Sequence, residues 1–177
     1  MIIRQETEND FPQIFEFVKT AFQTSHHSDG TEQNYFLKLR YGSTYIPELS
    51  LVMIDENDGG RLIGHIMLTK IAVKGVKSMP KNTFEILLLA PVAIALDHRN
   101  RGLGSDLIRE ALKQAKKEGY AAVILTGDPH YYERLGFVSA EKFNIKNKQN
   151  IPNENVLIYE LVAGILEGIE GTVDFIG

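Results

Sequence analysis

The chain contains 177 residues, 44% of them hydrophobic and 24% charged, with a formal net charge of −4 and no cysteine. This length suits one well-filled core and is short for two domains. The acidic balance argues against a binder of nucleic acid or membrane surfaces, and the lack of cysteine excludes disulfides, thiolate metal sites and a cysteine nucleophile. The opening residues are too charged for a signal peptide, and no apolar run approaches the ~20 residues of a membrane span, so a cytoplasmic protein is expected.

The first 42 residues predict a short strand and two helices. Ile2 and Ile3 begin the strand, and Asp10 is placed as the N-cap of the first helix. Asp29 and Glu32, three residues apart, form a second capping signature ahead of another helix. The aromatic residues of that second helix either fill the core or line a pocket. The apolar residues of the first helix recur at helical spacing and are Ile14, Phe17, Val18, Ala21 and Phe22.

A run of strands follows. Residues 49–55 and 61–73 are rich in apolar side chains and are joined by ENDGG, which favours a hairpin. Residues 83–96 are apolar on both faces, as in a central strand that is covered on each side. Pro91 cannot donate a hydrogen bond to a strand ladder, so it predicts a bulge or a splay in this central strand.

The second half of the chain alternates helices and strands. A helix begins near residue 103 and ends at Gly119, which suits the left-handed position after a helix. The segment AAVILTG predicts a buried strand, PHYYERLG a short helix, FVSA the start of a strand and VLIYELV a last strand. This element order predicts a mixed α/β fold with helices on both faces of the sheet, and residues 1–177 are expected to form a single domain.

The segment DHRNRGLGSDLI, residues 97–108, places basic side chains and glycines at the mouth of a helix. The N–H groups of a first helical turn lack partners and carry about half a positive charge. An anion bound there accepts hydrogen bonds from these groups and is attracted by their charge. Gly102 and Gly104 expose the backbone, while Arg99 and Arg101 add positive charge. The pattern indicates a cradle for a phosphate; the alternative is a tight turn with solvated arginines.

Two common phosphate-binding motifs do not fit this segment. A Walker loop requires a lysine after its last glycine, and none follows here. The dinucleotide fingerprint requires a third glycine, and its place is taken by Leu107. That fingerprint also belongs near a first βαβ unit, whereas this segment lies past the middle of the chain.

Residues 99–104 instead match the signature [QR]-x-x-G-x-[GA] of the GNAT N-acetyltransferases, which bind the pyrophosphate of coenzyme A. The preceding LAPVAIALDH resembles the acetyl-CoA strand of that family, and YERLGF resembles its Y-x-x-x-G-F motif. The element order also matches over nearly the full chain. More narrowly, GDPHYYERLGF and the tail YELVAGILEGIEGTVDF resemble the YhbS-like branch of these acetyltransferases.

The resemblance implies a single-domain GNAT-like fold, with a mixed, mostly antiparallel sheet in which two central strands splay apart around pantetheine. It implies acetyl-CoA as acyl donor and no metal. Asn100 stands where the family often has glycine and Leu96 where it often has proline, while Gly127 and its two successors replace a segment that contacts the cofactor in many relatives. The residues implied to bind the cofactor are Val92, Ala93 and Ile94 for pantetheine, and Arg99, Asn100, Arg101, Gly102, Leu103, Gly104 and Ser105 for the pyrophosphate.

In such enzymes an amine attacks the thioester directly, without an acyl-enzyme, and a backbone N–H near Ile94 is a candidate donor to the carbonyl oxygen. Tyr132 is the candidate acid for the leaving thiolate, with Tyr131 as its neighbour for comparison. At reference pKa values of about 10 and roughly 8.5, full proton transfer from tyrosine to thiolate is uphill by about 2 kcal/mol, so a hydrogen bond is as good a role as complete protonation.

The general base is open at this stage. Glu85 stands at the start of the central strand, where some relatives carry a base. Glu32 could line the acceptor pocket, although capping explains it equally well. His26 and His27 have a suitable reference pKa but no metal-ligand spacing with a third residue. A chain of water molecules is a further alternative.

Three functions compete for this sequence. The first is an N-acetyltransferase acting on a small-molecule or peptide amine, with no nucleic-acid or membrane partner, as a monomer or a homodimer. The second is a non-catalytic acyl-CoA-binding sensor on the same fold. The third is an α/β interaction module without a cofactor.

Overall fold

The computed structural model describes residues 1–24 and 28–177, which form two compact units. The first unit comprises residues 1–69 and 90–114, and the second comprises residues 70–89 and 115–177. Strands β3 (Arg61–Lys74) and β4 (Thr83–Ile94) and helix α3 (Leu103–Lys117) pass from one unit into the other. Along the hydrogen-bonded sheet the strand order is β1-β2-β3-β4-β5-β8-β6.

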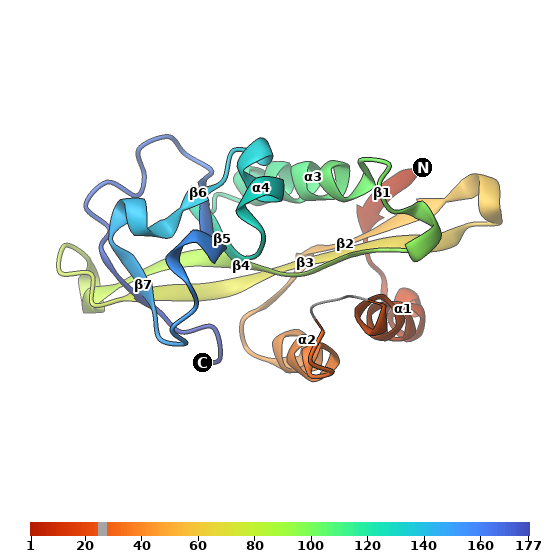
Figure 1. The fold of residues 1–177 in the computed structure, drawn as a ribbon, viewed down its shortest axis with the longest axis horizontal. Helices are drawn as coiled ribbons and strands as arrows, with labels where there is room; N and C mark the ends of the chain where they lie inside the picture. The colour runs from red at the N-terminus through yellow and green to blue at the C-terminus, as the bar shows by residue number, and fades with distance from the viewer. Residues whose placement is uncertain (25–27) are drawn as a thin grey trace. The chain divides into compact units, whose positions relative to one another are not determined.

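The first unit contains the predicted N-terminal strand, two helices and a long hairpin. Strand β1 pairs antiparallel with β2, and β2 pairs antiparallel with β3. Figure 1 shows α1 and α2 on one face of β2 and β3, with the part of α3 that belongs to this unit on the opposite face. The predicted helices on both faces are thus confirmed. The remaining elements of this unit are β1 (Ile2–Gln5), α1 (Phe11–Gln23), α2 (Glu32–Tyr41) and β2 (Tyr45–Asp55).

Apolar side chains of α1 and α2 bury themselves against this hairpin. Phe36 of α2 is only 1% exposed, so the core role of at least this aromatic residue is the correct alternative. Packing of an amphipathic helix on a sheet in this way supplies most of the helix stability, because short isolated helices are marginal in water. The fully packed cluster consists of Ile14, Val18, Phe36, Val52, Leu62 and Met67.

Asp10 occupies the N-cap position of α1 as predicted, but its side chain does not make the capping bond. Asp10 directly precedes α1, but its backbone is already helical and its side chain makes no bond to the first turn. A 3₁₀ turn, Glu8–Asp10, starts the helical path earlier, and Asp10 Oδ2 accepts from the N–H of Thr7 at 2.7 Å. Asp10 also binds the Arg4 guanidinium through both carboxylate oxygens. The chain therefore turns at Thr7, one turn before the predicted cap.

The second unit carries the short strands of the C-terminal half. Strand β4 pairs parallel with β5 at Leu87↔Val123 and Leu88↔Ile124, and β5 pairs antiparallel with β8. Most strand pairings among the described residues are antiparallel, which confirms the predicted mixed, mostly antiparallel sheet. The remaining elements are β5 (Ala122–Thr126), α4 (Pro129–Tyr132), β6 (Val138–Ser139), β7 (Ile145–Asn147), β8 (Val156–Glu160) and β9 (Gly171–Val173).

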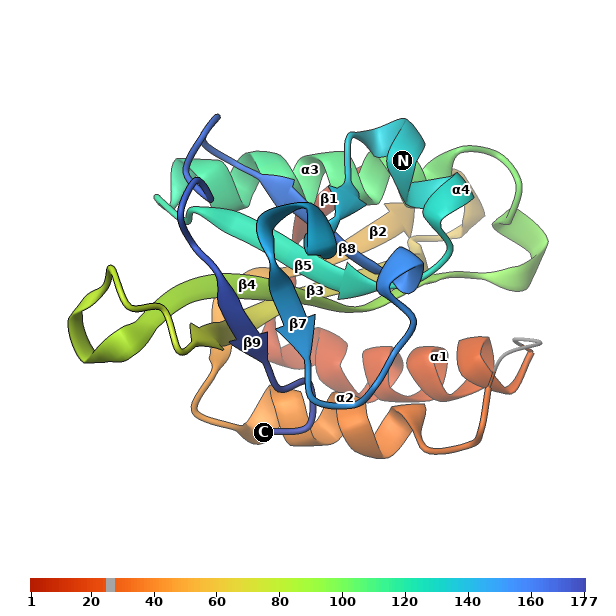
Figure 2. The same ribbon diagram turned by 60° about the vertical axis from the view of Figure 1, so that its left-hand side comes forward.

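Strands β7 and β9 were not predicted. Figure 2 shows them side by side, and they pair in parallel, while β9 also pairs with β3 at Lys74↔Thr172. Each has only three residues, which is too short for a periodic signal. Gly171 permits the close contact, because a Cβ there would lie 2.4 Å from the carbonyl oxygen of Lys74. Within the described residues, no helix has the length and apolar character to cross a membrane.

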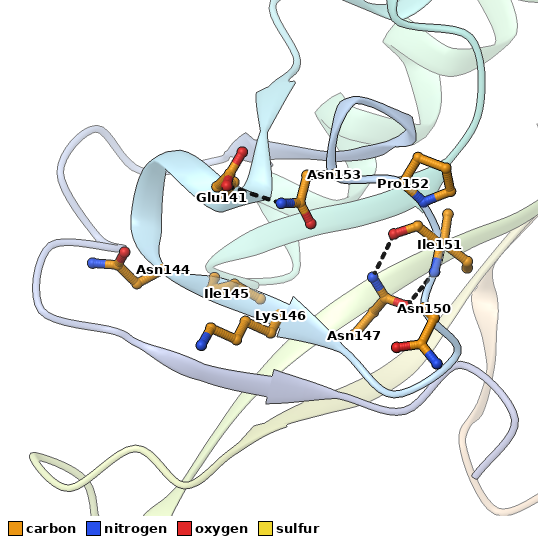
Figure 3. Close-up of a pocket in the computed structure, with 9 residues that line it drawn as sticks. All are labelled: Glu141, Asn144, Ile145, Lys146, Asn147, Asn150, Ile151, Pro152 and Asn153. Atoms are coloured by element: carbon orange, nitrogen blue, oxygen red, sulfur yellow. Dashed lines mark hydrogen bonds between the residues drawn. The ribbon is translucent and has the colours of Figure 1, made fainter.

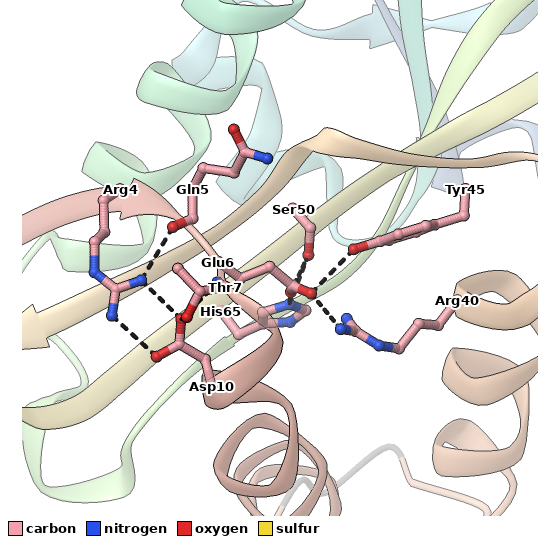
Figure 4. Close-up of polar contacts among 9 residues, drawn as sticks. All are labelled: Arg4, Gln5, Glu6, Thr7, Asp10, Arg40, Tyr45, Ser50 and His65. Atoms are coloured by element: carbon pink, nitrogen blue, oxygen red, sulfur yellow. Dashed lines mark hydrogen bonds and ion pairs between the residues drawn. The ribbon is translucent and has the colours of Figure 1, made fainter.

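A buried ionic cluster joins β1, α2, β2 and β3 within the first unit (Figure 4). Glu6 is 8% exposed and accepts hydrogen bonds from Arg40, Ser50 and Tyr45, the last at 3.0 Å. His65 Nε2 lies 3.3 Å from Glu6 Oε2. Burial raises the pKa of Glu6, but the hydrogen bonds with His65, Arg40 and Ser50 outweigh it and lower that pKa to about 2. Glu6 is therefore an ionised structural residue.

We predict that Glu6→Gln lowers the free energy of unfolding at pH 7 by about 3–5 kcal/mol, because it leaves the buried Arg40 charge without its partner. The folded pKa of about 2 lies below the reference value of 4.5, so ionised Glu6 stabilises the fold above pH 4.5 and that contribution is lost as the pH falls towards 2. Urea unfolding between pH 7 and 2.5 measures both effects. The variant should lack the wild-type loss below pH 4.5, whereas exposed Glu8→Gln should retain it; equal slopes in all three proteins contradict the prediction.

Candidate functional site

The segment between β4 and α3 forms the candidate phosphate cradle, and all of it lies in the first unit. The N–H of Ala95 donates to the Ile63 carbonyl at 2.8 Å, so the end of β4 is fixed to β3. A 3₁₀ turn, Leu96–His98, follows. Asn100 and Gly102 then adopt left-handed backbone conformations, with φ of 60° and 79°. Asparagine and glycine are the residues that tolerate this region best, so the sequence accounts for the sharp path of the loop.

The first turn of α3 presents its backbone outward. The backbone bond from Asp106 N to Gly102 O, 3.1 Å long, marks the start of the helical ladder. The N–H groups of Leu103 and Gly104 precede this bond and lie at the positive end of the helix dipole. A Cβ on Gly102 would meet no heavy atom within 4 Å, and Arg101 is exposed. The loop therefore combines both predicted features, a tight turn and an accessible basic helix N-terminus.

Three consecutive side chains fix the loop to other parts of the first unit. Asp97 accepts from Arg61 at 2.7 and 3.1 Å, and the hydrogen bonds from Arg61 and His98 lower the pKa of Asp97. His98 is 8% exposed, and its Nε2 lies 3.4 Å from Asp55 Oδ2. Arg99 donates from Nε to the Ile94 carbonyl at 3.1 Å, and its Nη2 reaches α1. These side chains hold the loop in addition to the backbone bonds of Ala95 and of the 3₁₀ turn.

The end of β4 presents alternate backbone groups to opposite sides. Because Ala95 N–H faces β3, alternation along an extended strand directs the groups of Ala93 to β3 and those of Val92 and Ile94 to the other side. The Ile94 carbonyl already accepts from Arg99, which leaves the Ile94 N–H as its outward group. Val92 and Ile94 are accordingly better placed than Ala93 to pair with an extended ligand.

A glycine lies beneath this loop and permits its close packing. A Cβ at Gly64 of β3 would lie 3.0 Å from both Ile94 Cδ1 and Met53 Cβ, and 3.3 Å from Leu107 Cδ2. Ile94 ends β4 and Leu107 belongs to the first turns of α3, so the two elements that flank the loop converge over this one position. A side chain at Gly64 would require these three neighbouring side chains to shift by a few tenths of an ångström.

A cleft of about 470 Å³ lies beside the loop in the same unit. One wall is a face of α1, and the other is formed by the residues that follow β4. Its lining is mostly apolar, with the Arg61–Asp97 ion pair at one edge. The lining residues are Phe17, Thr20, Ala21, Thr24, Arg61, Ala95, Leu96 and Asp97.

Tyr132, the candidate acid, ends helix α4 in the second unit. Its ring packs edge-to-face on Tyr131 and Phe137, with centroids 4.9 and 5.7 Å away. A Cβ at Gly127 would lie 2.5 Å from Tyr132 Cε2, so glycine at this position leaves room for the ring. Burial, with a smaller contribution from Tyr131, raises the pKa of Tyr132 to about 12. The phenol is therefore a neutral hydrogen-bond donor at physiological pH.

The candidate bases have different surroundings. Glu85 is exposed near the start of β4, in the second unit. Glu32 accepts from Ser28 Oγ at 2.9 Å and from Asp29 N at 3.2 Å, so it closes the turn before α2 as its capping signature predicted. His26 and His27 lie outside the described residues.

A second pocket of about 470 Å³ lies in the second unit, around β7 and the turn that follows it (Figure 3). Asn147 closes this turn, donating to the Ile151 carbonyl at 3.0 Å and accepting from the Ile151 N–H at 2.9 Å. Asn153 donates to Glu141 at 2.8 Å across the opening. The pocket uses none of the predicted site residues, and its lining is Glu141, Asn144, Ile145, Lys146, Asn147, Asn150, Ile151, Pro152 and Asn153.

Sequence reasoning missed the partners that anchor the loop. Asp55 and Arg61 flank the hairpin turn, and Ala21 and Thr24 lie at the end of α1, all far from the loop in the chain. The one available signal was the run Asp-His-Arg directly after a buried strand. Three adjacent side chains able to donate or accept strong hydrogen bonds indicate anchoring, but they do not identify the partner.

The family model "Acetyltransferase (GNAT) domain" matches residues 2–140. The uncharacterized N-acetyltransferase YhbS of Escherichia coli (strain K12) is 26% identical over 175 residues, which cover 99% of this chain and 96% of YhbS. The matched region of the family model contains the whole segment between β4 and α3 and also Tyr132.

Solved structures agree with this match. A crystal structure of E. coli YhbS in complex with CoA superposes with a TM-score of 0.82 at 28% identity and covers 98% of this chain and 88% of that chain. A GNAT family acetyltransferase from Brucella melitensis in complex with acetyl-CoA gives a TM-score of 0.75 at 24% identity and covers 97% of this chain and 93% of that chain. The predicted fold is thereby confirmed.

Proposed function

Because this chain belongs to the GNAT acetyltransferase family, we propose that it transfers an acetyl group from acetyl-CoA to a primary amine by direct attack, without an acyl-enzyme. The observation that carries the proposal is the open N-terminal turn of α3, approached through left-handed Asn100 and Gly102 and flanked by exposed Arg101. YhbS and the Brucella protein, which were crystallised with CoA and acetyl-CoA, support this choice of donor.

The proposed donor site follows the backbone from β4 into α3. Outward N–H groups at the end of β4 would pair with pantetheine, and the N–H groups of the first turn of α3 would hold the diphosphate. Open space over Gly102 lets a phosphate approach the backbone closely. The residues proposed to bind the donor are Val92, Ala93, Ile94, Arg99, Asn100, Arg101, Gly102, Leu103, Gly104 and Ser105.

We assign to Tyr132 the stabilisation of the departing thiolate. With its pKa raised to about 12 and a thiol at roughly 8.5, full proton transfer is uphill by about 5 kcal/mol, more than reference values indicate. The proposed role is therefore a hydrogen bond to the forming thiolate, which favours the transition state over the thioester. A neutral phenol that does not ionise near pH 8 keeps this donor available across the working range.

Glu85 is the proposed general base, acting on the ammonium of the acceptor directly or through water. Residues 1–177 are proposed to act as one acyl-CoA N-acyltransferase domain, because the YhbS match covers 99% of the chain. The acceptor class is a small-molecule or peptide amine, and the assembly is a monomer or a homodimer. The second function, a sensor that binds acyl-CoA without turnover, rests on the same cradle.

The first experiment separates these functions. Acetyl-CoA at a hundredfold excess over its dissociation constant should add about 2.7 kcal/mol to the free energy of unfolding, and free CoA should be released with part of a primary-amine panel. Thermal shift and a thiol-release assay measure the two effects. Stabilisation without release on any amine supports the sensor, and no stabilisation contradicts both functions.

Tyr132→Phe is expected to lower the turnover number about tenfold or more, with little change in CoA affinity, because it removes only a hydroxyl that acts on the leaving group. Tyr131→Phe is the matched control and should behave as wild type. Since the pKa of Tyr132 is about 12, the wild-type rate should show no decline from tyrosine ionisation up to pH 10. An unchanged turnover number in Tyr132→Phe removes this residue from the mechanism.

Glu85→Gln is expected to lower the turnover number about tenfold at pH 7 and to flatten the acid limb of the pH–rate profile, because the amide cannot accept a proton. Thr83→Ala changes a nearby exposed residue of the same strand and is the control for any change to the strand surface. An acid limb in Glu85→Gln that matches wild type would exclude Glu85 as the general base.

A further inference from the structure

We infer that the Arg99 side chain acts as a positioning residue, a clamp that holds the diphosphate loop between β4 and α1, while Arg101 supplies the loop's exposed positive charge. This inference rests on the proposed binding of CoA. It assigns different roles to two arginines that are only two residues apart and that carry the same charge.

Arg99 uses the fork of its guanidinium to join three separate groups. Its Nε donates to the Ile94 carbonyl at the end of β4, and its Nη2 donates to the Ala21 carbonyl and to Thr24 Oγ1, each at 3.1 Å. Three of its five N–H donors therefore point into the protein. Thr24 Oγ1 itself donates to the Ala21 carbonyl at 3.0 Å, which fixes the acceptor at the end of α1.

The hydrogen bonds of Arg99 cross a region where α1 and the loop do not pack tightly. Ala21 and Thr24 line the apolar cleft of about 470 Å³, together with Ala95 and Leu96 from the loop side. Leu96 is 65% exposed and does not seal this gap. Hydrogen bonds therefore connect α1 to the loop across this cleft. The Ala21 carbonyl can accept from the Arg99 guanidinium because the backbone hydrogen bonds of α1 end nearby.

Arg101 has the opposite setting. Its side chain is exposed, and among the described residues it forms no side-chain hydrogen bond or ion pair. It lies between left-handed Asn100 and Gly102, so its guanidinium extends from the most sharply turned part of the loop. A long, unpaired cation beside an anion site acts through charge, and that effect is screened by salt.

The two roles respond differently to lysine. Lysine keeps the charge but replaces a planar fork by a single ammonium, which cannot bond to β4 and α1 in the same arrangement. A clamp therefore fails with lysine as well as with glutamine, whereas a charge is preserved by lysine. This difference makes a set of four variants informative: Arg99→Lys, Arg99→Gln, Arg101→Lys and Arg101→Gln.

The experiment measures CoA binding by calorimetry at 50 and 300 mM salt, and pantetheine binding by NMR titration. Both Arg99 variants should raise the dissociation constant of CoA about tenfold at either salt concentration, with pantetheine binding changed less than twofold because it has no diphosphate. Arg101→Gln should raise the dissociation constant of CoA about fivefold at low salt and less at high salt. Arg101→Lys should have the wild-type dissociation constant. Thr24→Val removes one acceptor at the end of α1 and should raise the dissociation constant of CoA two- to threefold.

Amide exchange gives a readout that does not depend on the ligand. In Arg99→Lys the amides of residues 100–104 should exchange faster while the global unfolding midpoint of the core stays within a few degrees of wild type. Wild-type CoA affinity in Arg99→Lys with weak affinity in Arg99→Gln would show direct charge contact and overturn the clamp. Equal losses for CoA and pantetheine would show general damage and also overturn it. Failure of wild-type protein to bind CoA would instead refute the proposed function itself.

Discussion

An anion site built from backbone N–H groups cannot hold its own shape, since the groups that bind the ligand are not available to hold the loop. The segment between β4 and α3 meets this constraint with side chains. Asp97, His98 and Arg99 each reach a different element of the first unit, and the backbone of the next residues is left to turn outward. The exposed Arg61–Asp97 pair adds little energy by itself, because solvent screens it. The partly buried His98 and Arg99 contacts carry more of the anchoring, so the rigidity of the site depends on residues that need not touch the ligand.

In the cluster around Glu6 the charged groups are buried and paired with one another instead of being exposed. There the carboxylate is buried, receives three kinds of hydrogen bond, and pairs with an arginine whose Cζ also lies 4.3 Å from the centre of the Phe11 ring. Arg40 Nη1 and His65 Nδ1 have no hydrogen-bond partner in the part of the chain that the structure describes, but both are buried, and the cluster stabilises the packing of α2 on the hairpin. Buried or half-buried Arg40 and Arg99 thus serve architecture, whereas exposed Arg101 is available for electrostatic attraction of a ligand. Burial and partners, rather than residue type, separate these roles.

Much of the fold could be predicted from the sequence because its signals are local. The hairpin turn ENDGG, the apolar run of β4 and the helical spacing in α1 and α3 each lie within a short window. The turn that leads into α3, which we propose as the cradle, was predictable for the same reason, since its glycines, its arginines and the helix that follows are contiguous. The bonds of Arg99 were not, because Ala21 and Thr24 are more than seventy residues away and a carbonyl acceptor leaves no mark in the sequence. Strands β7 and β9 were missed because three residues give no period. The Asp10 side chain bonds to Thr7 and Arg4 instead of the first turn of α1, and a 3₁₀ turn precedes the helix.

The surroundings of Tyr132 limit the chemistry that it can perform. A ring packed between Tyr131 and Phe137, over a glycine that leaves room for it, is held in one orientation, and this is what a directional hydrogen bond requires. The same burial that fixes the ring also raises its pKa to about 12, which makes the phenol a poorer acid. A residue under both constraints is suited to stabilising negative charge that forms on a neighbouring sulfur, and unsuited to giving up its proton. If the proton that the amine loses does not pass through Tyr132, it must leave by another route, and for that reason the base is a separate problem from the acid in this protein.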